Sequence, residues 1–230
     1  MRPLPPGVVF DCDGTLADTE ALSDKAWIGA LGEHGYEPTE EDFGELVGYP
    51  FPANWAYFTA RVDLGDQERF RRGLRERFVA LFDAELELHD DAVGTLRELA
   101  EHGVPIGVAS SSTRASVHRV LDRAGIRELV RVVVGVDDVE EHKPAPEPYL
   151  RAAAALELDP RRCSAVEDTP VGVRSARAAG LFTVAVVRAH GDPDRLADAH
   201  RVVDEVTVDA LLGEHRRSAP SSGRRGAAGR

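Results

Sequence analysis

Residues 8–20 read VVFDCDGTLADTE, and this stretch decides the fold. A short apolar run, Val8–Phe10, ends in two aspartates, Asp11 and Asp13, that are one residue apart. Like charges held close together repel and are costly to remove from water, so buried strands do not normally end this way. Side chains alternate along a strand, so both aspartates can point one way while Cys12 points into the core. The pair is either an Asx turn that caps a helix or a functional group at a strand end.

Further apolar, β-branched runs follow along the chain, and each is short and continuous. They are Val104–Ala109, Leu129–Val134, Ser164–Val166 and Thr183–Val187. Such runs are typical of strands that are buried on both faces. Helical patterns lie between them, for example in residues 113–125 and 169–180, each of which ends in glycine. The alternation predicts an α/β fold with a Rossmann-like, mostly parallel sheet.

One segment, residues 18–86, reads as helix after helix with no strand, and most of the aromatic residues fall there. It predicts a small helical domain inserted after the first strand, with Asp18 and Thr19 capping its first helix. We therefore expect a core formed by residues 1–17 and 87–213. Residues 214–230 are basic and rich in Gly, Ser and Ala, and we expect a disordered tail there.

Composition excludes several classes of protein. The net charge of −12 argues against nucleic acid as a partner, because phosphate backbones require clustered Lys and Arg. No apolar run approaches the roughly 20 residues that span a bilayer, so we expect no membrane partner. No secretory signal is evident before the first strand, and Cys12 and Cys163 have neither disulfide nor metal-ligand spacing. We expect a cytoplasmic protein, and the sequence does not predict an oligomeric state.

Polar groups follow three of the other predicted strands. They are the serines at 110–112, Lys143 in EHKPAPEPY, and the pair Glu167–Asp168. In parallel α/β sheets, ligands bind at the carboxyl ends of the strands, so these groups are candidates for one site. Each also has a simpler interpretation. The serines and the acidic pair could cap the helices that follow them, and Lys143 could be a solvated loop residue.

Taken together, the motifs resemble the haloacid dehalogenase superfamily of phosphotransferases. DCDGTL matches its first motif, VAS its second, HKPAPEPY its third and VEDTPVGVRSARAAG its fourth, in that order and at strand ends. The resemblance extends to about Leu212, and DGTLADTE…AW is similar to the β-phosphoglucomutase-like branch. It implies a Rossmann-like catalytic core with an inserted all-helical cap, which corresponds to residues 18–86.

The resemblance also implies roles for single residues. Asp11 would be the nucleophile that forms an aspartyl-phosphate, and Asp13 the general acid and then the general base. A hard divalent cation, Mg²⁺, would be held by Asp11, Glu167, Asp168 and the backbone carbonyl of Asp13. The phosphoryl group would be bound by Ser110, Ser111, Lys143, Gly14 and Thr15.

A charge count supports the need for a metal. Up to four carboxylates and a phosphate would share one pocket, with Lys143 as the only assigned cation. Two like charges about 4 Å apart repel by roughly 4 kcal/mol at an effective dielectric constant near 20, so one lysine does not offset them. A divalent cation would offset them and would also polarise the transferred group.

Three functions fit these expectations: a hydrolase of a small phosphate ester, such as a sugar phosphate; a phosphomutase of the β-phosphoglucomutase kind; and a silent binding module. The module is disfavoured because the motif residues are all present, and a dehalogenase because a halide leaving group needs no proton from Asp13. A mutase must hold a second phosphate, yet LVGYPFPANW has no cation where β-phosphoglucomutases have an arginine, and Ser23 replaces their histidine. We therefore favour the hydrolase, although arginines in ERFRRGLRER could substitute.

Overall fold

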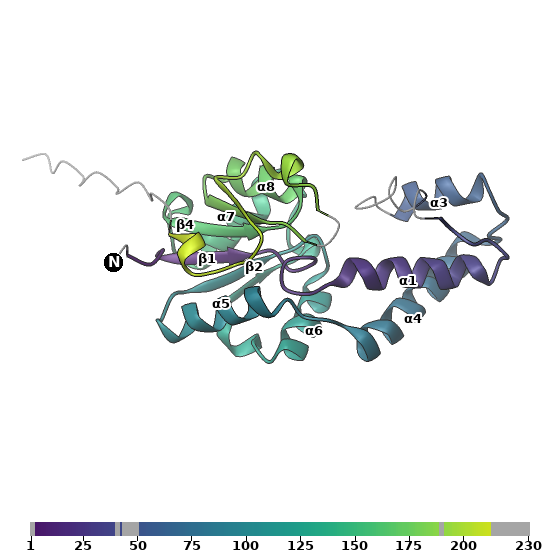
Figure 1. Cartoon of the computed structure of the whole chain (residues 1–230), viewed down its shortest axis with the longest axis horizontal. Helices are drawn as coiled ribbons and strands as arrows, with labels where there is room; N and C mark the ends of the chain where they lie inside the picture. Colours follow the sequence, from purple (N-terminus) through teal and green to yellow (C-terminus); the bar gives the residue numbers. More distant parts are fainter. Residues whose placement is uncertain (1–2, 40–41, 43–50, 189–190, 213–230) are drawn as a thin grey trace, which may run out of the picture.

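The computed structural model describes residues 3–39, 42, 51–188 and 191–212. Its centre is a six-stranded parallel sheet in the order β3-β2-β1-β4-β5-β6 (Figure 1). The strands are β1 (Gly7–Phe10), β2 (Ile106–Ala109), β3 (Val132–Val134), β4 (Cys163–Glu167), β5 (Phe182–Val186) and β6 (Arg201–Val203). The predicted α/β class and all five predicted strands are confirmed, and β6 is an additional strand at the edge next to β5.

The helices of the core cover both faces of this sheet. Figure 1 shows α5 and α6 on one face and α7 and α8 on the other. Their bounds are α5 (Asp90–Glu101), α6 (Arg114–Ala124), α7 (Glu147–Ala155) and α8 (Pro170–Ala178).

Alternation along β1 divides the core between the two faces. Val8 and Phe10 belong to the cluster that contains the buried residues of α5 and α6. Val9 belongs to the cluster with those of α7 and part of α8. Both faces of β1 are therefore dry, as its continuous apolar run predicts.

The remaining long helices form a separate layer beyond the carboxyl ends of the strands. They are α1 (Thr19–Gly32), α3 (Phe51–Thr59) and α4 (Gln67–Glu85), at the right of Figure 1. They enclose an aromatic cluster of their own around Trp27, Phe58 and Phe70. We propose that residues 18–86 form a cap domain on a core of residues 1–17 and 87–213. The predicted tail, 214–230, lies outside the described residues.

The two connections between cap and core lie side by side. Ala17 and Leu88 form an isolated antiparallel bridge, and the amide of Asp18 donates to the carbonyl of Glu87. Asp18 is the N-cap of α1, as predicted, and its carboxylate accepts from the amide of Ala21. Of the described residues, none belongs to a helix long and apolar enough to cross a bilayer.

Candidate active site

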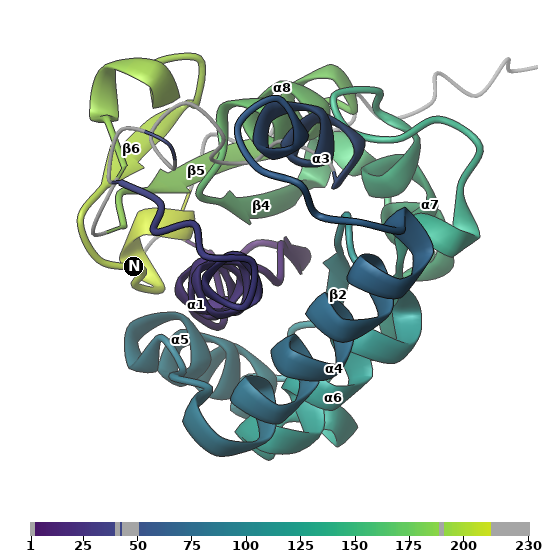
Figure 2. The ribbon, with the colours of Figure 1, turned by 90° about the vertical axis from the view of Figure 1, so that its right-hand side faces the viewer.

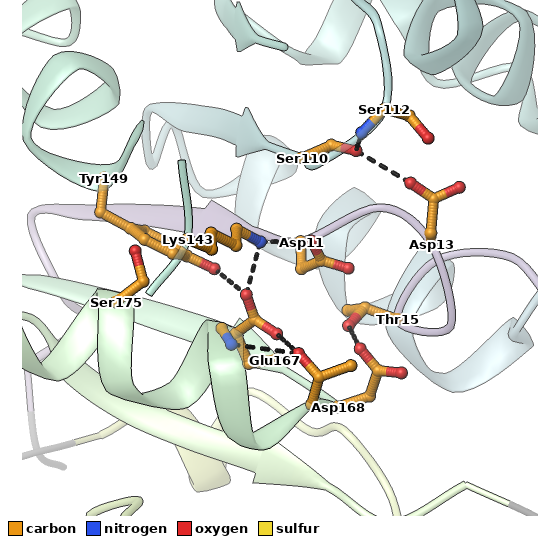
Figure 3. A network of polar contacts seen from close by, with 12 residues as sticks. Asp11, Asp13, Thr15, Ser110, Ser112, Lys143, Tyr149, Glu167, Asp168 and Ser175 are labelled. Carbon is orange, nitrogen blue, oxygen red and sulfur yellow. Dashed lines mark hydrogen bonds and ion pairs between the residues drawn. The ribbon is translucent and has the colours of Figure 1, made fainter. Parts of the chain in front are cut away.

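The carboxyl edge of the sheet gathers the predicted polar groups into one site (Figure 3). Asp11 follows β1 directly, and its amide donates to the carbonyl of Val166 in β4. Ser110 follows β2, and Glu167 is the last residue of β4. Lys143 reaches the same place from the connection between β3 and α7. The strands therefore bring together residues that are up to 157 positions apart in the chain, from Asp11 to Asp168.

Lys143 is a buried cation between two carboxylates. Its ammonium lies 2.6 Å from Oδ1 of Asp11 and 2.6 Å from Oε1 of Glu167. Its side chain is only 4% exposed, so the interpretation as a solvated loop lysine is wrong. Burial opposes the charge, but Asp11 and Glu167 outweigh burial and raise the pKa of Lys143. The ammonium therefore stays charged throughout the physiological range.

Glu167 sits in a fitted pocket made by residues that the sequence did not single out. The Tyr149 hydroxyl donates to its Oε1 at 2.5 Å, and the Thr169 hydroxyl donates to its Oε2 at 3.2 Å. A Cβ on Gly172 would lie 1.9–2.0 Å from the carboxylate, so only glycine leaves room there. The signal for Tyr149 was its place on the buried face of α7, although nothing local indicated a contact with Glu167.

Thr169 also decides how the next helix begins. Its hydroxyl accepts from the amide of Gly172, which makes Thr169 the N-cap of α8. The acidic pair, Glu167–Asp168, is therefore free of the capping role that was its alternative interpretation. In the same way Thr113, not a serine of 110–112, is the N-cap of α6.

Asp168 is held by the loop that follows β1. The Thr15 hydroxyl donates to its Oδ1 at 3.1 Å. Gly14 has a φ of +77°, and a Cβ there would lie 2.0 Å from Oδ2 of Asp168. Glycine thus satisfies both the left-handed backbone and the close approach. The predicted roles of Gly14 and Thr15 in phosphate binding remain predictions, because Asp168 accepts from the Thr15 hydroxyl and occupies the space beside Gly14 in this structure.

Asp13 points away from the other carboxylates. Its Oδ2 accepts from the Ser110 hydroxyl at 2.8 Å and its Oδ1 from the Thr19 hydroxyl at 2.9 Å. Thr19 was predicted to cap α1, but it is the first residue of that helix and its hydroxyl is directed to Asp13. Ser110 also accepts from the amide of Ser112, and Ser111 is exposed. The Asx-turn interpretation fails, because these partners of Asp13 are side chains from other elements.

The remaining three carboxylates suit a metal ion. One oxygen each from Asp11, Glu167 and Asp168 lies within 4.8 Å of the others. Burial raises the pKa of Asp11, which the neighbouring carboxylates raise further and Lys143 opposes. Burial also raises the pKa of Asp168, with Glu167 as the next cause. The negative charge therefore exceeds what Lys143 offsets, and this all-oxygen donor set fits a hard divalent cation. The carboxylate of Asp13 is not part of it.

The cap contributes a cavity of about 230 Å³ between α1, α3 and α4. Figure 2 shows α1 end-on, with α3 above it and α4 running obliquely beside it. Its lining combines aromatic and cationic side chains: Ser23, Ala26, Trp27, Phe51, Arg71, Leu74, Arg75 and Phe78. The guanidinium of Arg71 lies 5.3 Å from the centre of the Phe51 ring. Two arginines of ERFRRGLRER, Arg71 and Arg75, thus line this cavity as exposed residues. Residues 46–50 of LVGYPFPANW lie outside the described residues.

Comparison with known proteins decides the family. Residues 8–186 match the model of the haloacid dehalogenase-like hydrolases, a range that includes β1 from Val8 onward, strands β2–β5, the helices between β1 and β2, and every motif described above. The chain belongs to this family. The family consists of hydrolases, so the chain is an enzyme. This confirms the family resemblance inferred from the four motifs.

The chain is similar to two phosphatases and to a solved structure along most of its length. The chain is 30% identical, over 86% of its own length and 93% of the relative, to validoxylamine A 7'-phosphate phosphatase from Streptomyces hygroscopicus subsp. limoneus. It is 32% identical to fructose-1-phosphate phosphatase from Escherichia coli, over 78% of this chain and 95% of that one. A Thermotoga maritima structure assigned as a β-phosphoglucomutase superposes with a TM-score of 0.78 at 26% identity, covering 90% of this chain and 96% of the other.

Proposed function

We propose that this chain is a phosphomonoester hydrolase that acts on a small phosphorylated metabolite, such as a sugar phosphate, through an aspartyl-phosphate on Asp11. The observation that carries the proposal is the convergence at one sheet edge of Asp11, the buried cation Lys143 and the pair Glu167–Asp168. The two phosphatase relatives support it, since their named substrates are small phosphate esters.

In the first step, a carboxylate oxygen of Asp11 attacks phosphorus, and the bond to the ester oxygen breaks as the acyl phosphate forms. Asp13 gives its proton to the departing oxygen, which leaves as an alcohol. The contacts of Asp13 with Ser110 and Thr19 hold its carboxyl between the end of β2 and the first residue of α1. In the proposed reaction the leaving group would lie next to this carboxyl.

In the second step, Asp13 takes a proton from water, and the water oxygen attacks phosphorus to release phosphate and regenerate Asp11. Lys143 stays charged and neutralises phosphoryl oxygens as negative charge develops on them. Asp11, Glu167 and Asp168 would hold Mg²⁺, together with the backbone carbonyl of Asp13. When bound, the cation supplies charge neutralisation that Lys143 alone does not provide.

A phosphomutase is the second candidate, and a specific observation favours it. Arg71 and Arg75 line the cap cavity, so the cap does offer cations that could bind a second phosphate. The Thermotoga maritima structure points the same way. We rank the hydrolase first because the two relatives reported at 30% identity or more are named phosphatases.

A phosphate-release screen over sugar phosphates, nucleotides and small phosphorylated acids, with Mg²⁺, tests the proposal. We expect at least one ester to be hydrolysed with turnover that requires the metal. A second incubation uses β-glucose 1-phosphate, Mg²⁺ and a trace of the 1,6-bisphosphate. Glucose 6-phosphate that accumulates much faster than free phosphate would establish the mutase instead.

A further inference from the structure

Arg188 lies outside all four motifs, yet its side chain reaches the loop that follows β1. Its Nη2 donates to the carbonyl of Thr15 at 2.9 Å, and its Nε donates to the carbonyl of Gly14 at 3.2 Å. Its Nη1 donates to Oδ2 of Asp91 at 3.0 Å. The guanidinium is mostly buried, with 18% of the side chain exposed. No step of the proposed chemistry uses it.

The loop that Arg188 contacts determines where two functional carboxylates lie. Asp13 directly precedes Gly14, and the hydroxyl of Thr15 donates to Asp168. Gly14 has a left-handed backbone, and glycine has more conformational freedom than any other residue. Two successive carbonyls bound to one planar cation fix the orientation of both peptide groups. Arg188 and the carbonyls of Gly14 and Thr15 thus form a clamp, which restricts the backbone freedom that Gly14 introduces between Asp13 and Thr15.

The other side of the guanidinium is anchored in the core. Asp91 lies in the first turn of α5, and the Oδ2 that accepts from Arg188 also accepts from the amide of Val206 at 2.8 Å. The carbonyl of Val206 accepts in turn from the Thr95 hydroxyl, one turn further along α5. Arg188 thus connects the loop that follows β1 to a hydrogen-bonded point between α5 and the segment after β6.

Only arginine fits these three acceptors at once. The guanidinium is a rigid planar fork with donors on three nitrogens, whereas the lysine ammonium is a single point on a flexible stem. A charged donor also makes stronger hydrogen bonds to carbonyls than a neutral one. The arrangement of two carbonyls and one carboxylate around a plane matches that fork.

We propose that Arg188 is a positioning residue for phosphoryl transfer, which holds Asp13 and Thr15 in register with Asp11 and Asp168. The proposal rests on the proposed function, because it takes the roles of Asp13 and Asp168 from there. The competing explanation is that Arg188 only stabilises the fold through its ion pair with Asp91.

Three variants separate these explanations. Arg188→Met keeps much of the shape and removes every contact, and we expect kcat to fall ten- to a hundredfold with KM within threefold of wild type, because a displaced catalytic group mainly affects the chemical step. Arg188→Lys can keep at most some of the hydrogen bonds, so its kcat should lie between those of wild type and Arg188→Met. Asp91→Asn removes the charge of the ion pair but keeps a side-chain oxygen that can accept from Nη1, and it leaves both carbonyl contacts, so kcat should stay within threefold.

The assays are run at a temperature below the unfolding transition of each variant. A folded Arg188→Met protein with wild-type kcat would overturn the proposal, and so would equal losses of kcat in Asp91→Asn and Arg188→Met. If Arg188→Met does not fold, Arg188→Lys takes its place. A larger loss of kcat in Arg188→Lys than in Asp91→Asn supports the proposal, and equal losses overturn it.

Amide hydrogen exchange provides a readout that does not depend on turnover. The amides of Gly14 and Leu16 donate within the loop, to the carbonyls of Ala17 and Cys12. We expect exchange in a peptide covering residues 11–19 to become at least tenfold faster in Arg188→Met or Arg188→Lys and to remain unchanged in Asp91→Asn. Unchanged exchange in the Arg188 variants refutes the clamp. Absence of phosphate release by the wild-type protein instead refutes the proposed function and leaves this measurement valid.

Discussion

Replacement of Gly172 by alanine should disable the active site and leave the fold in place. Gly172 lies in the first turn of α8, where its missing side chain leaves room for the carboxylate of Glu167. A Cβ there would lie 1.9 Å from Oε1 and 2.0 Å from both Cδ and Oε2 of Glu167. Contacts under 3.0 Å are essentially never seen for a Cβ, so the carboxylate has to retreat by more than 1 Å.

The size of the effect follows from what holds the carboxylate. Glu167 accepts from Lys143 at 2.6 Å and from Tyr149 at 2.5 Å, in a place with no solvent access. A hydrogen bond to a charged group contributes about 1.5–3 kcal/mol, and a displacement of about 1 Å in an active site can cost about a hundredfold in rate. We expect kcat/KM to fall by about 10²- to 10³-fold, together with a higher Mg²⁺ concentration for half-maximal activity.

The assay measures kcat/KM on the best ester from the phosphate-release screen, with thermal unfolding of the same preparation. The matched control is Gly94→Ala in α5, where a new Cβ would meet nothing within 4 Å. That change should leave activity unaltered and add about 0.5–1 kcal/mol of stability, because alanine favours a helix interior over glycine. Gly172→Ala protein that unfolds cooperatively and retains activity within threefold of wild type would refute the fitted position of Glu167.

Two further predictions concern the metal and the stability of the core. Asp168→Ala should weaken the affinity for Mg²⁺ more than Glu167→Ala does, because Lys143 and Tyr149 also bind Glu167. A larger rise in the Mg²⁺ concentration for half-maximal activity in Glu167→Ala would contradict this. The pKa of Asp91 is lowered because hydrogen bonds from Arg188 and Val206 outweigh burial. Asp91→Asn should therefore have a lower free energy of unfolding than wild type above about pH 4. The difference should shrink as the pH falls below that value, as measured by chemical unfolding at several pH values. A difference that grows at low pH would show that the sign is wrong.

The sequence predicted most of the fold because its buried strands are continuous apolar runs. β6 was missed since Arg201–Val203 offers only two apolar residues beside charged neighbours. The start of β2 was predicted too early, at Val104. The strand begins at Ile106, after a proline that has no N–H to donate.

The site was predictable where residues lie at or just after the carboxyl ends of strands. Asp11 and Ser110 directly follow β1 and β2, Glu167 is the last residue of β4, and the sheet brings them together. Tyr149, Gly172 and Arg188 were missed because each acts on a residue that is distant in sequence or across a turn. Arg188 contacts a loop more than 170 residues earlier, and no local pattern encodes that contact.

The most direct test of the central claim is to identify the covalent intermediate. The enzyme is quenched in acid during turnover of its best ester with Mg²⁺, reduced with borohydride and analysed by peptide mass spectrometry. An acyl phosphate on Asp11 is reduced to homoserine, and we expect this change at residue 11, only when substrate is present, and not in Asp11→Asn, which should also lack turnover. Reduction at another carboxylate, or phosphate release by Asp11→Asn at a rate near that of wild type, would contradict the account.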